Sequence, residues 1–170
     1  MQTTPERASM LSPGATGPRG LAALIGWIAL CFLPAAGILL SRPDAWYAAL
    51  QKPSWNPPNA VFGPVWSGLY LMMGGAAWLV WAQGGFARQR VPLTLFLLQL
   101  VLNGVWEPLF FGAHQIAWAL VDSALLWAVI ALTLLMFSRV SRYAAALLIP
   151  YLMWVSFATA LNFTLWRLNR

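Results

Sequence analysis

Between Ile116 and Phe137 the chain reads IAWALVDSALLWAVIALTLLMF, and Asp122 is the only charged side chain in this stretch. A helix needs about 20 predominantly apolar residues to cross the hydrocarbon core of a bilayer, which is about 30 Å thick. Because lipid offers the backbone no hydrogen-bond partners, such a stretch can cross the membrane only as a helix. The stretch therefore predicts a transmembrane helix.

Further apolar runs of similar length lie on both sides of it: Gly20–Leu40, Phe62–Gln83, Val91–Phe111 and Arg142–Trp166. The chain of 170 residues is 61% hydrophobic and 8% charged, whereas an average globular chain has about 25% charged residues. We expect an all-α integral membrane protein, in which residues 20–170 form a single five-transmembrane-helix domain. Residues 1–19 are rich in Ser, Thr, Pro and Gly, and we expect a disordered N-terminal tail there.

The charged and reactive side chains exclude several functions. The net charge is +6, but the ten cations are scattered along the chain in ones and twos, so we expect no nucleic-acid partner. The chain has one cysteine, Cys31, and one histidine, His114, which argues against a disulfide and against a metal site. No nucleophile occurs together with a base and an orienting acid, so conventional enzymatic chemistry is not expected.

The connection from Ser41 to Val61 is too long for a simple turn. Its first part predicts a short interfacial helix that begins after Asp44, a residue type that favours the N-cap position. Its second part is stiff, because prolines fix the backbone and remove hydrogen-bond donors. We predict either a lid over the mouth of the bundle or an anchor at headgroup depth, formed by the aromatic and Pro-rich residues Trp55, Asn56, Pro57 and Pro58.

Helical spacing places polar and aromatic side chains on shared faces of the predicted spans. A carboxylate that faces lipid is costly, so Glu107 and Asp122 should face the bundle, a cavity or an interface. For Asp122 we favour a hydrogen bond to another helix. Four tryptophans share faces with polar or small residues, which fits either core packing or a pocket for a planar guest; they are Trp66, Trp106, Trp118 and Trp154.

Several local motifs together resemble those of one membrane protein family. The segments are KPSWNPP at 52–58, GPVW at 63–66, QLVLN at 99–103, WALVD at 118–122 and PYLMW at 150–154. They are similar to the motifs of the translocator protein family, also called tryptophan-rich sensory proteins or peripheral benzodiazepine receptors. The resemblance runs from about Ser41 to the C-terminus.

The resemblance implies a function as well as a fold. It implies a membrane receptor or carrier that binds porphyrins, such as protoporphyrin or haem, without covalent attachment, and that also takes benzodiazepine-type and isoquinoline-type ligands. It further implies a homodimer, a role in tetrapyrrole transport or stress regulation, and at most a weak light-dependent degradation of the porphyrin. The residues that match the family's ligand cavity are Phe62, Trp66, Asn103, Trp106, Trp118, Trp154, Ala158 and Leu161.

The last predicted helix departs from the animal pattern of the family. A sterol motif in animal members combines Leu or Val with a spaced Tyr and a spaced Lys or Arg, and such motifs are weak signals. Here Leu161 and Arg167 are present, but Phe163 replaces the tyrosine. We therefore expect a bacterial membrane, with the mitochondrial outer membrane as the alternative. The alternative function is a regulatory membrane scaffold that binds a sterol or a partner protein.

Overall fold

The computed structural model describes residues 17–37, 41 and 43–170, and every regular element in these residues is helical. The predicted tail, residues 1–19, lies mostly outside the described residues. In chain order the elements are α1 (Pro18–Cys31), the 3-10 turn η1 (Pro34–Ala36), α3 (Ala45–Ala49), α4 (Asn59–Trp81), α5 (Gly85–Arg88), α6 (Arg90–Glu107), the π-helical turn η2 (Pro108–Gly112), α7 (Ile116–Ser138) and α8 (Arg142–Leu168).

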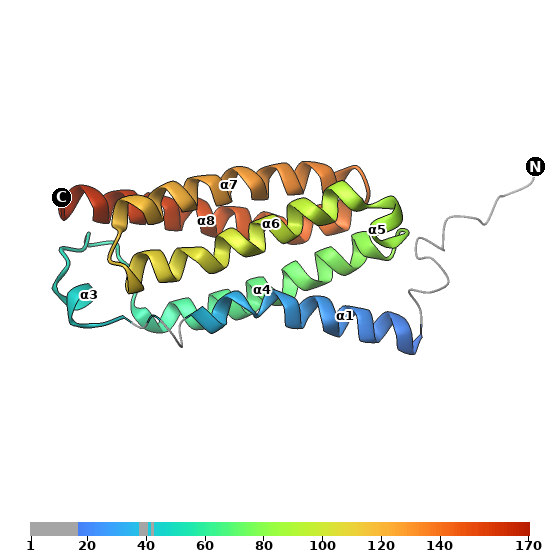
Figure 1. Cartoon of the computed structure of the whole chain (residues 1–170), viewed down its shortest axis with the longest axis horizontal. Helices are drawn as coiled ribbons and strands as arrows, with labels where there is room; N and C mark the ends of the chain where they lie inside the picture. The colour runs from blue at the N-terminus through green and yellow to red at the C-terminus, as the bar shows by residue number, and fades with distance from the viewer. Residues whose placement is uncertain (1–16, 38–40, 42) are drawn as a thin grey trace, which may run out of the picture.

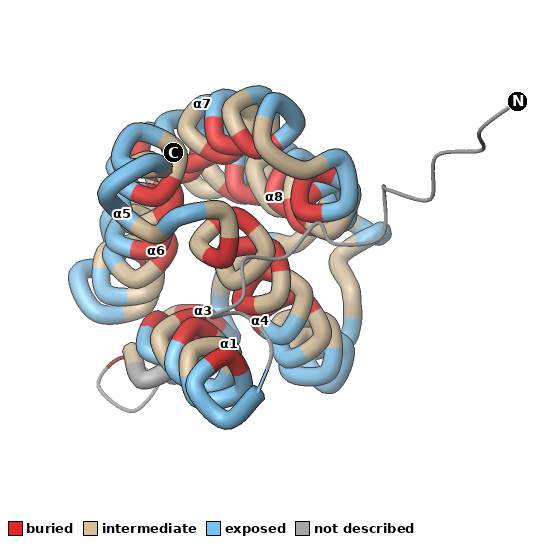
Figure 2. Tube along the Cα trace, turned by 90° about the vertical axis from the view of Figure 1, so that its right-hand side faces the viewer, coloured by how far each residue is buried: buried red, intermediate tan, exposed pale blue. Residues whose placement is uncertain are grey.

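The long helices lie side by side in one bundle (Figure 1). Helix α7 packs against α6 and α8, and α4 packs against α1 and α8. Figure 2 looks along the bundle and shows that the buried residues lie on the inward sides of the helices, whereas exposed residues cover the outside. Short α3 and the loop that follows it lie at the end of the bundle where the C-terminus lies (Figure 1).

The predicted helical membrane architecture is confirmed. Within the described part of the chain, four helices are long and apolar enough to cross a bilayer: Asn59–Trp81, Arg90–Gly112, Ile116–Ser138 and Arg142–Leu168. Their ends lie within a few residues of the predicted spans. The predicted short helix is also present as α3, and the Asp44 side chain caps it by accepting a hydrogen bond from the Tyr47 amide at 3.1 Å.

The first helix is shorter than predicted. The prediction was one continuous span, Gly20–Leu40. Helix α1 ends at Cys31 after 14 residues, which corresponds to about 21 Å of helix. A turn at Phe32 and Leu33 then leads into η1, which begins at Pro34. Pro34 has no backbone N–H to donate to the Leu30 carbonyl, and its ring clashes with that carbonyl, so the α-helical pattern of hydrogen bonds cannot continue through it. The end of the predicted span, residues 38–40, lies outside the described residues.

Glycine allows α1 and α4 to approach each other closely. A Cβ atom added to Gly74 would lie 2.7 Å from the Cα atom of Ile28, a distance that real Cβ atoms do not adopt. The Trp78 indole of α4 also donates a hydrogen bond of 3.0 Å to the Gly20 carbonyl of α1. Small residues at such crossings let two helix backbones come into contact. The α1–α4 pair therefore forms one wall of the bundle in spite of the short first helix.

A chain of buried hydrogen bonds joins three helices at the centre of the bundle. The Tyr70 hydroxyl of α4 donates to Asn103 Oδ1 of α6 at 3.2 Å, and Asn103 Nδ2 donates to the Tyr151 hydroxyl of α8 at 3.2 Å. Tyr151 in turn donates to Gln99 Oε1 at 2.8 Å. Polar bonds of this kind are typical between membrane helices. They fix the spacing of α4, α6 and α8, between which the cavity described next lies.

Candidate ligand-binding cavity

A cavity of about 500 Å³ lies among α4, α6, η2 and α8, near the end of the bundle that α3 covers. Helix α4 contributes six residues to its lining, η2 and the end of α6 contribute four, α8 contributes four, and the segments before and within α3 complete it. In that order they are Asn59, Phe62, Gly63, Trp66, Ser67, Tyr70; Trp106, Glu107, Phe110, Phe111; Ala158, Leu161, Asn162, Leu165; and Phe32, Ala35, Pro43, Tyr47.

Eight of the eighteen lining residues are aromatic. Trp106 and Phe110 stack at 4.9 Å between ring centroids with an interplanar angle of 15°. Across the cavity, Trp66 lies 5.3 Å from Tyr70 on α4. Ala158 is the smallest side chain contributed by α8 to the lining. A wall that combines rings with small residues suits a flat apolar guest, because rings offer large contact area at defined orientations.

Proline explains how two of these rings reach the cavity. Pro108 lacks a backbone N–H and its ring clashes with the carbonyl four residues earlier, so it disturbs the α-helical pattern of hydrogen bonds. After Pro108 the chain forms a π turn, closed by a hydrogen bond of 2.8 Å from the Ala113 amide to the Pro108 carbonyl. This turn presents Phe110 and Phe111 to the cavity. Single π turns are frequent at functional sites.

Two of the polar side chains in the wall have buried atoms without a hydrogen-bond partner among the described residues. Glu107 lines the cavity, and its Oε2 atom is buried without a hydrogen-bond partner among the described residues. Asn162 also lines the cavity, is 1% exposed, and has no described partner for either amide atom. A buried polar atom without a partner is costly. These two side chains are thus the groups in the wall most ready to bond to a guest.

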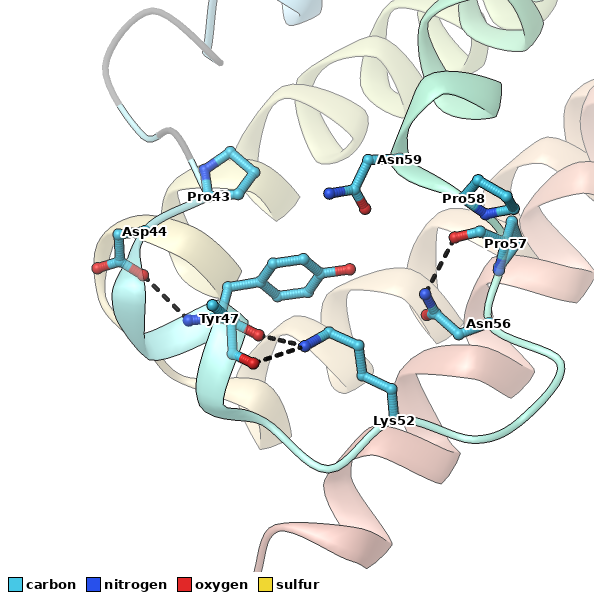
Figure 3. Close-up of a pocket in the computed structure, with 9 residues that line it drawn as sticks. Pro43, Asp44, Tyr47, Lys52, Asn56, Pro57, Pro58 and Asn59 are labelled. Carbon is cyan, nitrogen blue, oxygen red and sulfur yellow. Dashed lines mark hydrogen bonds between the residues drawn. The ribbon is translucent and has the colours of Figure 1, made fainter.

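A second pocket, of about 540 Å³, lies outside the cavity and is enclosed by α3 and the Pro-rich loop (Figure 3). Tyr47 projects between the two spaces and lines both of them, as do Pro43 and Asn59. Lys52 donates hydrogen bonds to the carbonyls at the end of α3, including that of Tyr47 (Figure 3). Partial burial raises the pKa of the Tyr47 hydroxyl, so it stays protonated at neutral pH.

The short helix is held at both of its sides. His114, which follows η2, lies with Nε2 3.2 Å from Asp44 Oδ2 and stacks on the Trp46 ring at 4.1 Å. The hydrogen bond from the Tyr47 amide holds the pKa of Asp44 below its ordinary value. On the other side, the Asn169 side chain exchanges hydrogen bonds of 2.9 and 3.0 Å with the Gln51 backbone. The loop is thus attached to both the α6–α7 connection and the C-terminus.

Five of the eight residues expected around a ligand line the cavity together: Phe62, Trp66, Trp106, Ala158 and Leu161. Three lie elsewhere. Asn103 belongs to the buried hydrogen-bond chain, and Trp154 packs behind the wall, with its ring 5.8 Å from that of Phe62. Trp118 is 64% exposed on the outer surface of α7.

The position of Trp118 follows from the direction in which α7 packs. The buried residues of this helix form one stripe that includes Ala119, Asp122 and Leu126. Trp118 is turned from Ala119 by about 100° of helix rotation, which places it outside that stripe. The expected inward position of Asp122 is observed, but its Oδ2 atom has no hydrogen-bond partner among the described residues.

The expected lid residues and the expected sterol motif are divided between different surfaces. Asn56, Pro57 and Pro58 line the outer pocket and not the cavity. Trp55 is 46% exposed and packs its ring against Phe157 at 5.7 Å. Of the sterol motif, Leu161 lines the cavity, whereas Phe163 and Arg167 are exposed and lie against each other.

Sequence reasoning did not place several cavity residues that the structure brings together. Tyr47 could have been found from its position in the predicted interfacial helix, and Asn162 from its stripe on the last span. Glu107 was expected inside the bundle without a defined location. No local signal indicated Phe32 and Ala35, because they reach the cavity only through the break after α1.

Fold and site together define the class: a helical integral membrane protein with an aromatic cavity between its helices, closed at one end by a structured loop. Comparison with known proteins assigns the family. The model of the TspO/MBR family matches residues 22–167, and the chain belongs to this family.

Relatives occur in animals and bacteria. The human translocator protein is 52% identical over 126 residues, which cover 73% of this chain and 75% of the relative. The tryptophan-rich protein TspO of Chlorobaculum tepidum is 45% identical over 152 residues, or 88% of this chain and 92% of the relative. The tryptophan-rich sensory protein of Cereibacter sphaeroides is 38% identical over 148 residues, which cover 87% of this chain and 92% of the relative. These names describe translocator and sensory proteins rather than enzymes.

Proposed function

We propose that this protein binds a flat tetrapyrrole, such as protoporphyrin or haem, without covalent attachment, in the cavity among α4, α6, η2 and α8. The observation that carries the proposal is the cavity itself. Its volume of about 500 Å³ lies within the range of roughly 300–1,000 Å³ that is typical of small-molecule sites. Eight of its eighteen lining residues carry aromatic rings, which can stack on a conjugated macrocycle.

In the proposed complex the macrocycle lies against Trp66 on one side and Trp106 on the other, and Ala158 leaves room for its edge. The carboxylates of the guest turn away from Glu107, because two like charges in a medium of low dielectric repel each other strongly. They therefore point toward the loop end of the cavity, where Tyr47 and Asn59 separate it from the outer pocket.

Titration of the purified protein with protoporphyrin, followed by quenching of tryptophan fluorescence, tests the proposal. We expect saturable quenching. Ala158→Phe places a ring inside the cavity, and overpacking of about 1–3 kcal/mol should weaken binding roughly tenfold or more. Trp118→Leu is the matched control, because Trp118 is 64% exposed on the outer surface. Equal affinity of Ala158→Phe and the unmodified protein contradicts the proposal, as does lost binding in Trp118→Leu.

The biological role belongs to the same proposal. We propose that binding serves tetrapyrrole transport or stress-linked regulation in a bacterial membrane, with the protein as a homodimer. Tryptophans beside a photoexcited macrocycle can donate electrons, so slow light-dependent degradation of the guest is an expected side reaction. Illumination of the loaded protein, with the porphyrin absorption band as the readout, tests this last point.

A further inference from the structure

The cavity contains a carboxylate that tetrapyrrole binding does not use. Glu107 is the last residue of α6 and lines the cavity beside Trp106. Its Oε2 atom is buried and accepts no hydrogen bond from any described residue. The ion pair found among the described residues joins His114 to Asp44 and does not involve Glu107. An ionised carboxylate in such surroundings is costly unless a cation or a strong donor faces it.

A second side chain points to the same chemistry. Asn162 on α8 is 1% exposed, lines the same cavity and has no described partner for its Oδ1 or Nδ2 atom. Buried amides in folded proteins nearly always have hydrogen-bond partners. The unpartnered atoms of Asn162 and Glu107 are covered by neighbouring atoms, so a guest with N–H groups bonds to them once these two side chains rotate toward the cavity that they line.

Aromatic rings surround these acceptors. Trp66, Tyr70, Trp106 and Phe110 line the cavity together with Glu107. The face of an aromatic ring attracts a cation, and the attraction is larger where water is excluded. A cage of rings with one carboxylate is therefore complementary to a flat organic cation, in both shape and charge.

We propose that this cavity is also a binding site for lipophilic aromatic cations that carry an amino group, with Glu107 as the counter-charge and Asn162 as a further acceptor. This ligand class goes beyond the proposed tetrapyrrole, whose carboxylates are repelled by Glu107. The cation enters with its ring between Trp66 and Trp106 and with its amino group toward the two acceptors.

A pair of nearly isosteric probes tests the charge preference. In slightly alkaline buffer 9-aminoacridine is a cation, whereas acridine is neutral. Both are titrated into the full-length protein in nanodiscs of zwitterionic phosphatidylcholine, with tryptophan fluorescence as the readout. We expect 9-aminoacridine to bind roughly tenfold more tightly than acridine. Equal affinity for the two probes overturns the proposal.

Two variants distinguish the effect of the Glu107 carboxylate on cation binding from the effect of other acidic groups in the protein. Glu107→Gln should abolish the preference for 9-aminoacridine over acridine. Asp122→Asn is the matched control, because Asp122 is also a buried carboxylate with an unpartnered oxygen but does not line the cavity. A loss of preference in Asp122→Asn as large as that in Glu107→Gln overturns the proposal.

The location of the bound cation is tested with Ala158→Phe, which should weaken binding of 9-aminoacridine. An unchanged affinity places the cation elsewhere and overturns the proposal.

A protoporphyrin titration of the same samples distinguishes this inference from the proposed function. If the cation binds and protoporphyrin does not, only the proposal of tetrapyrrole binding is refuted. If protoporphyrin binds and the cation is not preferred, only the proposal of cation binding is refuted.

Discussion

Asn103 shows how one residue can matter to the cavity without lining it. It is 6% exposed and connects the hydroxyl groups of Tyr70 and Tyr151, and Tyr70 in turn lines the cavity. Asn103→Leu should lower the free energy of unfolding by about 1–3 kcal/mol, because the buried Tyr70 hydroxyl loses its acceptor and the Tyr151 hydroxyl keeps only its bond to Gln99. Thermal unfolding in detergent measures this effect.

The control for this prediction is Thr164→Val. The Thr164 hydroxyl donates only to the Ala160 carbonyl of its own helix, and such bonds contribute little to stability. An unfolding temperature of Asn103→Leu equal to that of Thr164→Val would show that the hydrogen-bond chain does not stabilise the bundle.

Asp44 gives the loop a defined response to acid. Its folded-state pKa lies below the ordinary value because the Tyr47 amide donates to it. The stabilisation is therefore complete above the unfolded-state pKa of about 3.9, and it is lost as the pH falls through the lower folded-state value. Asp44→Asn keeps a capping side chain that does not titrate.

We expect the difference in unfolding temperature between the unmodified protein and Asp44→Asn to shrink toward the low end of an acid series. A difference that stays constant with pH contradicts this role of the carboxylate. The comparison with Asp44→Asn removes the effects of titrating groups that do not contact Asp44, since they are present in both proteins; His114, which faces Asp44, belongs to the measured effect.

At the scale of elements, the contact between α1 and α4 depends on one glycine. A Cβ atom at Gly74 would lie 2.7 Å from Ile28 Cα, whereas a Cβ atom at neighbouring Gly75 would lie 3.7 Å from the end of the Leu147 side chain. Gly74→Ala should separate the two helices and lower the unfolding temperature, at a cost of about 1–3 kcal/mol from overpacking. Gly75→Ala, which makes an ordinary contact, should have little effect; equal destabilisation by both contradicts the close approach.

The four long spans could be predicted from the sequence because hydropathy and length are local properties. The break after Cys31 was missed because the apolar run continues past Pro34 although the helix does not. The π turn at Pro108 was missed for a similar reason, since a proline near a helix end permits several backbone geometries.

The inward direction of each helix was harder to predict. Lipid is as apolar as the interior of a membrane protein, so hydrophobicity does not separate the two sides of a helix. Polar residues did indicate the inside: Asn103, Glu107 and Asp122 all face the bundle or its cavity. Tryptophan did not indicate the inside, because its side chain is stable both in the bundle and on the outer surface. Trp118 lies on the outer surface, whereas Trp66 and Trp106 line the cavity.

At the scale of the whole molecule, the bundle combines a packed hydrophobic core with an aromatic cavity near the end that α3 covers. The hydrogen-bond chain fixes α4, α6 and α8, and the π turn adds two phenyl rings. Helix α3, held by Asp44, His114 and Asn169, then closes one end. The same wall offers ring faces to a macrocycle and a carboxylate to a cation.

A structure determined with bound protoporphyrin tests the central claim most directly. The proposal predicts density for the macrocycle between the rings of Trp66 and Trp106, beside Ala158, with its carboxylates toward Tyr47. Density confined to the outer surface of α7 near Trp118, with the wall residues closed against one another, would contradict it.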